Sequence, residues 1–252
     1  MANPLTFSGA DGKLPTVDRV LQILTAVAQQ GAPMPVRLLG ELTGLPSSTL
    51  YRHLAVLRRW GFVEESEREG CYEPGPMSLQ LAWGGQSSQL VKIAHAELEA
   101  LVAQTGESAG LMVAVNGHVV CLDMVESPQS LRCSFCKGSA IPMLNGASAK
   151  AQLAFLPARE RAEIVRQHLG AEPLAVHAAL EQELQAIRDQ GYAVSEGEVD
   201  WGVWGVSVPI LSRSDRLLGG LSLMAPSVRV AERHKPLIQT TVAAAGRIGR
   251  HF

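Results

Sequence analysis

A predicted helix over Ser48–Trp60 has the side chains with the clearest chemical potential in this sequence. The stretch from Gly44 to Phe62 contains three arginines and no acidic residue, and the helix face opposite a leucine stripe is polar, then cationic. Short hydroxyls near a helix N-terminus can approach phosphates and base edges, and arginines reach phosphate or guanine. This layout suits a helix that enters the major groove of DNA, and a solvated surface helix is the alternative. The residues that could contact DNA are Ser47, Ser48, Thr49, Tyr51, Arg52, His53 and Arg59.

A second candidate site is the segment Asn145–Ala151, which opens a predicted helix after an extended stretch that ends at Pro142. Free N–H groups at a helix N-terminus attract an anion. The small side chains of Gly146, Ala147 and Ser148 would let an anion come close, and the carboxylate of a small organic acid fits. Ordinary capping of the helix by Asn145 or Ser148 is the alternative.

Motifs for catalysis and metal binding are missing from the sequence. It contains no GxSxG, GxxxxGK[ST], GxGxxG or HExxH pattern, and its histidines are scattered. Asp123 and Glu126 lie three positions apart on a predicted strand, where side chains diverge, so a surface pair is expected. Cys133 and Cys136 have the spacing of half a zinc site, but no second half follows. We expect no enzyme activity, no metal site and no cofactor.

The composition excludes two broad classes of protein. With 46% hydrophobic residues and a net charge of -2 in 252 residues, the chain can bury a core and is not expected to be disordered. No apolar run is long enough to span a membrane, and the first residues lack a secretion signal. We therefore expect a cytoplasmic protein of one large or two modest domains, without membrane contact.

The first third of the chain reads as three helices and a hairpin. Apolar residues at helical spacing predict a first helix from Thr16, which could cap it, to a stop at Gly31. A short second helix over Val36–Thr43 precedes the helix over Ser48–Trp60, and Phe62–Gly75 predicts a hairpin with a charged tip. This order is typical of a winged helix-turn-helix domain.

After a polar stretch around residues 84–88, a helix over Leu90–Gln104 leads into mixed strands and helices. Strands in hairpins with helices on their faces predict an α+β sandwich. The predicted strands are Ser108–Val115, Val119–Val125, Ser130–Phe135, Tyr192–Glu198, Val203–Ile210 and Leu217–Met224, and the predicted helices are Gly146–Phe155, Ala158–His168, Ala178–Gln190 and Glu232–Phe252.

Several separated motifs carry a family resemblance. Thr16–Leu24 and Gly44–Leu57 resemble the DNA-binding half of IclR-type transcriptional regulators, and Pro142–Ala151, Ile187–Val194 and Leu217–Pro226 follow in that family's order and spacing. The resemblance covers roughly residues 16–250. It implies the α+β class, with an N-terminal winged helix-turn-helix domain, a linker helix and a C-terminal GAF-like α/β effector-binding domain. The expected limits are 1–15 for a flexible N-terminal arm, 16–78 for the DNA-binding domain, 79–106 for the linker helix region and 107–252 for the effector-binding domain.

The resemblance also implies function and partners. It implies a sequence-specific regulator that binds double-stranded operator DNA, under control of a small organic-acid effector, as a homodimer or a dimer-of-dimers tetramer. The family's effector positions fall at Cys133, Ile141, Ala147, Ser148, Ser195, Val203, Gly205, Ser222 and Met224.

Two of these positions depart from the family pattern. Relatives often have Cys where this chain has Gly205, and Ser where it has Met224. The resulting pocket should be roomier and less polar, so we expect an effector larger than a two- or three-carbon acid, such as an aromatic or branched carboxylate. The alternative is that the methionine fills the space that the glycine opens.

The DNA-binding half departs from the family as well. The hairpin tip over Glu64–Glu69 is acidic, and Ser47 stands where many relatives have a basic residue. Non-specific affinity for DNA comes from cation–phosphate contacts, so we expect it to be modest. A ligand-binding sensor that acts through protein contacts without binding DNA is the rival interpretation.

Overall fold

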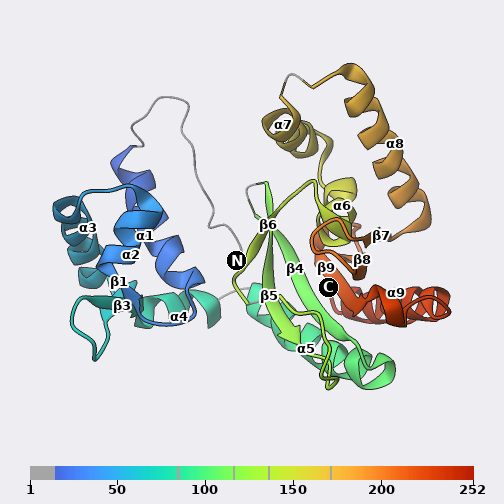
Figure 1. Cartoon of the computed structure of the whole chain (residues 1–252), viewed down its shortest axis with the longest axis horizontal. Coiled ribbons are helices and arrows are strands. Elements are labelled where there is room, and N and C mark those ends of the chain that lie inside the picture. The colour runs from blue at the N-terminus through green and yellow to red at the C-terminus, as the bar shows by residue number, and fades with distance from the viewer. Residues whose placement is uncertain (1–14, 84–85, 116, 136, 171) are drawn as a thin grey trace. The chain divides into compact units, whose positions relative to one another are not determined.

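The structure is a computed structural model that describes residues 15–252 except 84–85, 116, 136 and 171 (Figure 1). The chain divides into two compact units, Met1–Gln89 and Leu90–Phe252, and each has a hydrophobic core of its own. The predicted N-terminal arm lies, up to residue 14, outside the described residues. Within the described ranges, no helix combines the length and the apolar character that a membrane crossing requires.

The first unit is a helix-turn-helix domain with a small sheet. Its elements are α1 (Thr16–Gln29), β1 (Met34–Pro35), α2 (Val36–Thr43), α3 (Ser47–Arg59), β2 (Val63–Glu65), β3 (Cys71–Pro74) and α4 (Pro76–Trp83). The strands form an antiparallel sheet in the order β1-β3-β2. Gly44 ends α2 in a left-handed conformation, with φ of 67°, and its N–H donates to the carbonyl of Gly40. Ile23, Leu39, Leu50 and Leu54 from the three helices are fully buried together.

The second unit is built on one six-stranded antiparallel sheet. The sheet has the order β6-β5-β4-β9-β8-β7. Its strands are β4 (Ser108–Val115), β5 (His118–Val125), β6 (Ala140–Pro142), β7 (Ala193–Glu196), β8 (Val203–Leu211) and β9 (Leu217–Pro226), and its helices are α5 (Gln86–Thr105), α6 (Gly146–Phe155), α7 (Ala158–Leu169), α8 (Leu174–Gln190), the 3₁₀ turn η1 (Ser227–Arg229) and α9 (His234–Gly249).

Helices cover both faces of this sheet (Figure 1). On one face α9 packs against β8 and β9, and α5 contributes to the same core, in which Leu98, Leu223 and Ile248 are fully buried. On the other face α6, α7 and α8 form a second core, to which Leu153 and Met224 contribute. Neighbouring residues of β9 thus serve opposite cores, as side chains alternate along a strand. The mixed helix-and-sheet class predicted from the sequence is confirmed.

Three local predictions are wrong. Ser130–Phe135 is not a strand: Arg132 and Ser134 both bind the carboxylate of Glu126, each at 2.7 Å, so the segment turns around this side chain. Residues Ala140–Pro142 pair with β5 instead. Thr16 does not cap α1 but is its first residue, after Pro15. The predicted helix from Ala178 begins at Leu174, directly after Pro173, because proline fits the start of a helix.

Two glycines of α9 give a matched test of how this helix packs on the sheet. A Cβ at Gly249 would lie 2.2 Å from the carbonyl oxygen of Leu211 in β8, whereas a Cβ at Gly246 would have no neighbour within 4 Å. We expect Gly249→Ala to lower the free energy of unfolding by roughly 1–3 kcal/mol. Gly246→Ala should raise it by up to about 1 kcal/mol, because alanine favours the helix. Urea unfolding of both variants is the measurement, and equal midpoints would contradict this packing.

Candidate functional site

Helix α3 presents a polar surface in the first unit. The helix starts at Ser47, where the carbonyl of Pro46 accepts hydrogen bonds from the N–H groups of Thr49 and Leu50 at 2.9 and 3.0 Å. Its leucines face the core, and Thr49 is half-buried. The exposed residues among those expected to contact DNA are Ser47, Ser48, Tyr51, Arg52 and Arg59. They form a short polar start followed by cationic side chains, as the sequence predicted.

His53 does not belong to this surface, and the prediction that it could contact DNA is wrong. Its side chain is buried, with 3% exposed, because it follows Leu50 by three positions and so faces the core beside Leu54. Burial, together with the charges of Arg52 and Arg19, lowers the pKa of His53 below its usual value. Its Nε2 has no hydrogen-bond partner among the described residues.

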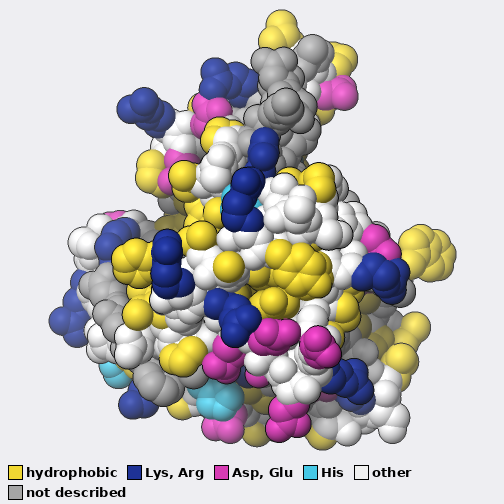
Figure 2. All heavy atoms as spheres, turned by 90° about the vertical axis from the view of Figure 1, so that its left-hand side faces the viewer, with side chains coloured by type: hydrophobic (Ala, Val, Ile, Leu, Met, Phe, Trp, Pro, Cys, Tyr) yellow, Lys and Arg dark blue, Asp and Glu magenta, His cyan; other side chains and the backbone are white. Residues whose placement is uncertain are grey.

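The hairpin that follows α3 is acidic in space as well as in sequence. Glu64, Glu67 and Glu69 are exposed. Glu65 accepts a hydrogen bond from the N–H of Gly70 at 3.0 Å and forms an ion pair with Arg58 at 3.0 Å, which neutralises this arginine at the end of α3. Figure 2 shows a group of acidic side chains on this side of the molecule, with basic side chains directly beside it.

The second unit contains a small, partly open pocket at the start of α6. Eight of the nine expected effector positions line it, and Cys133 does not. Its lining residues are Phe135, Ile141, Gly146, Ala147, Ser148, Ser195, Val199, Asp200, Val203, Gly205, Val206, Ser222, Leu223 and Met224. The strand register explains part of this grouping, because Gly205 lies between Ser195 and Met224 in one row across β7, β8 and β9.

The first N–H groups of α6 have acceptors from the β7 side of the cavity. The N–H of Gly146 donates to Oε2 of Glu198 at 3.1 Å, and that of Ala147 donates to Oγ of Ser195 at 2.9 Å. The side chain of Asn145 makes no capping hydrogen bond, so capping by this residue is wrong. Gly146 has a φ of 81°, and a Cβ there would lie 2.6 Å from Cγ2 of Val199, which requires glycine.

Buried hydroxyls form the polar wall of the cavity. Oγ of Ser148 lies 3.0 Å from Oγ of Ser222, which in turn lies 2.9 Å from Oγ of Ser207. A hydroxyl can donate and accept, so this chain of three can reorient toward a ligand that reaches Ser148 or Ser222. The capping alternative for Ser148 is therefore wrong in this structure, since its hydroxyl binds Ser222.

Lys150, one turn into α6, holds two carboxylates. Its Nζ lies 2.7 Å from Oε1 of Glu183 in α8 and 2.9 Å from Oε2 of Glu198. Burial alone would lower the pKa of Lys150, but the hydrogen bonds to Glu183 and Glu198 outweigh it and raise the pKa. The lysine therefore stays charged and ties α6 to both α8 and the segment after β7.

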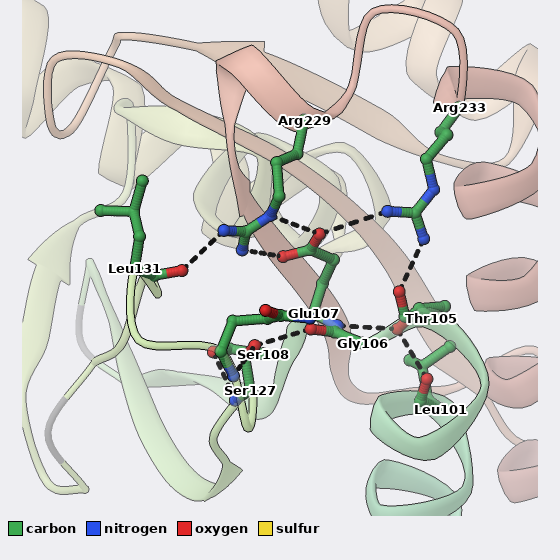
Figure 3. Close-up of polar contacts among 10 residues, drawn as sticks. Leu101, Thr105, Gly106, Glu107, Ser108, Ser127, Leu131, Arg229 and Arg233 are labelled. Atoms are coloured by element: carbon green, nitrogen blue, oxygen red, sulfur yellow. Dashed lines mark hydrogen bonds and ion pairs between the residues drawn. The ribbon is translucent and has the colours of Figure 1, made fainter.

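A buried carboxylate, that of Glu107, binds the arginine that holds Leu131 (Figure 3). Leu131 lies in the loop that leads to Phe135 in the cavity wall. Glu107, with 2% exposed, accepts hydrogen bonds from Arg229 at 2.9 and 2.5 Å and from Arg233 at 3.4 Å. Arg229 also donates to the carbonyl of Leu131 in that loop at 2.7 Å. Arg233 donates to the carbonyl of Thr105, the last residue of α5, at 2.6 Å.

A second buried carboxylate fixes the other end of the same loop. Asp123 was expected in a surface pair with Glu126, and this is wrong: it is buried, 2.7 Å from Nδ1 of His95 and 2.6 Å from Nζ of Lys137. Burial alone would raise the pKa of Asp123, but hydrogen bonds from Lys137 and His95 outweigh it and lower the pKa. Among the described residues, no group of His, Cys, Asp or Glu could hold a metal; Cys136 lies outside them.

Four residues that line or adjoin the cavity were not among the expected effector positions. Phe135, Val199 and Asp200 line the cavity, and Glu198 reaches the start of α6, but all four lie in loops without a motif. The only signal for the segment around Val199 was its two acids, Glu198 as the last residue of the predicted strand Tyr192–Glu198 and Asp200 two positions further on. Conversely, Cys133 was expected in the wall and instead packs, half-buried, against the second core.

Comparisons with known proteins agree with this architecture. The family model described as IclR helix-turn-helix domain matches residues 16–67, and the one described as bacterial transcriptional regulator IclR C-terminal matches residues 85–250. The first unit is thus the DNA-binding domain of a transcriptional regulator. The chain belongs to the IclR family of bacterial transcriptional regulators, whose members among the curated relatives are regulators and repressors rather than enzymes.

Individual relatives resemble the chain over most of its length. The probable transcriptional regulator SauR of Cupriavidus necator is 29% identical, over 84% of this chain and 85% of its own. The C-terminal domain of a putative transcriptional regulator from Vibrio cholerae is 38% identical, over 66% of this chain and 99% of its own, with a TM-score of 0.59. An IclR homologue from Microbacterium hydrocarbonoxydans, solved with 4-hydroxybenzoate, shares the fold at a TM-score of 0.76 and 21% identity, over 93% and 98%.

The environment of Asp123 predicts how stability depends on pH. Because the folded-state pKa of Asp123 lies below its ordinary 3.8, its contribution is present above that value and is lost as the pH falls through the folded-state pKa. Asp123→Asn should lower the free energy of unfolding at neutral pH. It should also reduce the decrease in the free energy of unfolding that the wild type shows as the pH falls. Urea unfolding from pH 7 down to about pH 3 checks this. The control is Asp189→Asn on the exposed surface of α8, and identical pH profiles for the wild type and Asp123→Asn would refute the assignment.

Proposed function

We propose that this protein is a sequence-specific regulator whose affinity for operator DNA changes when a small organic acid binds in the cavity at the start of α6. The observation that supports it most is the grouping of eight expected effector positions around one cavity in the second unit. An effector changes DNA affinity only through unequal affinity for two forms of the protein. The helix of the linker region, 79–106, between the DNA-binding domain over 16–78 and the effector-binding domain over 107–252, is the proposed connection between the two sites.

The DNA-binding surface in this proposal is the polar face of α3. Ser47, Ser48 and Thr49 would approach phosphates and base edges at the helix start, where N–H groups and small hydroxyls favour anions. Tyr51, Arg52 and Arg59 would reach bases or phosphates further along. As a homodimer or a pair of dimers, the protein would place two such helices in successive major grooves, about 34 Å apart, on a palindromic operator. It would act in the cytoplasm, with DNA and a metabolite as partners.

The cavity suits an acid with an apolar body. Its polar side offers the start of α6 and the hydroxyls of Ser148, Ser195 and Ser222, and its apolar side has Ile141 and Met224. The absence of a side chain at Gly205 leaves room in the middle of the row. The 4-hydroxybenzoate in the homologue from Microbacterium hydrocarbonoxydans supports an aromatic acid.

The acidic hairpin favours a second candidate function, a ligand-binding sensor that acts through protein contacts. Its exposed glutamates would repel phosphates, and Arg58 is already paired with Glu65. This candidate predicts that α3 is not used for DNA, so the same variant distinguishes the two functions.

Arg52→Ala tests the DNA-binding surface. We expect it to weaken binding to the protein's own promoter by roughly ten- to a hundredfold, since a specific arginine contact is worth about 1–3 kcal/mol. The affinity for an effector should not change. Arg159→Ala, at an exposed arginine on α7, is the control for net charge and should bind DNA normally. Fluorescence anisotropy with promoter and random duplexes measures both, and undiminished binding by Arg52→Ala would favour the sensor.

Calorimetric titration tests the class of effector. Benzoate-type acids should bind the full chain, and glyoxylate should bind at least about tenfold more weakly, because it leaves the apolar side of the cavity unfilled. Met224→Ser restores a hydroxyl and should shift the preference toward the smaller acid. Tight glyoxylate binding without a response to benzoate would reverse the proposed effector class.

A further inference from the structure

The start of α6 already binds a carboxylate in this structure, and it is the protein's own. Oε2 of Glu198 accepts the hydrogen bond from the N–H of Gly146 at 3.1 Å and lies 2.9 Å from Nζ of Lys150. Oε1 of the same residue lies 3.0 Å from that ammonium. The start of α6 is therefore a carboxylate-binding site, because hydrogen-bond donors and a cation converge there on one anion.

The segment that contains Glu198 also covers the cavity. Val199 and Asp200 line it, and Val199 presses on Gly146 so closely that no side chain fits there. Trp201, in the same segment, is 99% exposed, so its side chain does not pack the segment against the rest of the unit. The carboxylate of Glu198 is thus the polar group that fixes the segment between β7 and β8 to α6.

We propose that Glu198 is an internal competitor of the effector, and that an effector carboxylate replaces it at the N–H of Gly146. The inference rests on the function proposed above. The exchange keeps the hydrogen bond at the N–H of Gly146, because one carboxylate leaves this group and another arrives. Glu198 does not lose its ion partner, because Lys150 binds it independently and also holds Glu183.

Two consequences follow for recognition. The affinity for an acid is lowered by the cost of displacing Glu198, so the response threshold is set within the protein. A neutral analogue cannot replace the charged carboxylate of Glu198 at the helix start. The contact between Glu198 and Gly146, called the latch below, therefore also selects acids over their amides and esters.

The test compares Glu198→Gln and Glu198→Ala with Glu183→Gln in the full chain. Glu183→Gln removes the same charge from the same lysine but leaves the helix start occupied. Benzoate is the anionic probe and benzamide the neutral one, both measured by calorimetry. We expect the Glu198 variants to bind benzoate about tenfold more tightly than the wild type, the value of one charged hydrogen bond. Benzamide, and benzoate with Glu183→Gln, should change by less than about twofold.

Thermal melting shows that each variant is folded before titration, and the conservative Glu198→Gln keeps the test available if Glu198→Ala is unstable. Unchanged or weaker benzoate binding by a folded Glu198→Gln overturns the latch and leaves the proposed function standing. An equal increase in affinity for benzoate and benzamide also overturns the latch. In that case the substitution would only make the cavity more accessible, without removing a competing carboxylate. If neither the wild type nor any variant binds benzoate, the aromatic-acid effector in the proposed function fails, and the latch fails with it.

Discussion

The N–H groups that begin α6 impose the central constraint on the effector-binding unit. A helix leaves its first N–H groups without partners, and buried ones require acceptors. Here Glu198 and Ser195, 52 and 48 residues away from their donors, supply them, and Gly146 provides the room. Because these acceptors lie on and after β7, the satisfied helix start brings α6 and the sheet edge together. The cavity lies at this junction.

The two faces of the sheet in the second unit have different roles. One face is filled by α5 and α9, and the other contributes Ser222 and Met224 to the cavity and packs α6. Two buried carboxylates, Glu107 and Asp123, hold the loop that contains Phe135, and each is paired with cations. Removing one member of such a cluster leaves a buried charge unpaired, so the loop has a fixed geometry. Buried ion pairs thus hold the loop beside the cavity, and the contact that we propose to be exchanged, between Glu198 and Gly146, lies at the start of α6.

Local patterns predicted most helices and strands, because their periodicity reflects burial against a single face. The grouping around Ser195, Gly205 and Met224 was predicted from the family resemblance, and the strand register accounts for it. Glu198 and Val199 escaped prediction since a loop has no period, and their roles depend on a helix far away in sequence. His53 was misplaced because a polar residue type outweighed its position beside Leu54 on the core face. Ser130–Phe135 alternated like a strand, but Glu126 draws its polar side chains into a turn.

A crystal structure of the full chain with benzoate tests the central claim most directly, namely that the start of α6 receives the effector's carboxylate. The account predicts benzoate oxygens at hydrogen-bond distance, about 2.7–3.2 Å, from the N–H groups of Gly146 or Ala147. It also predicts the ring beside Ile141 and Met224, with Glu198 bound to Lys150 alone. Benzoate bound outside this cavity, or with its carboxylate turned away from α6, would contradict the claim.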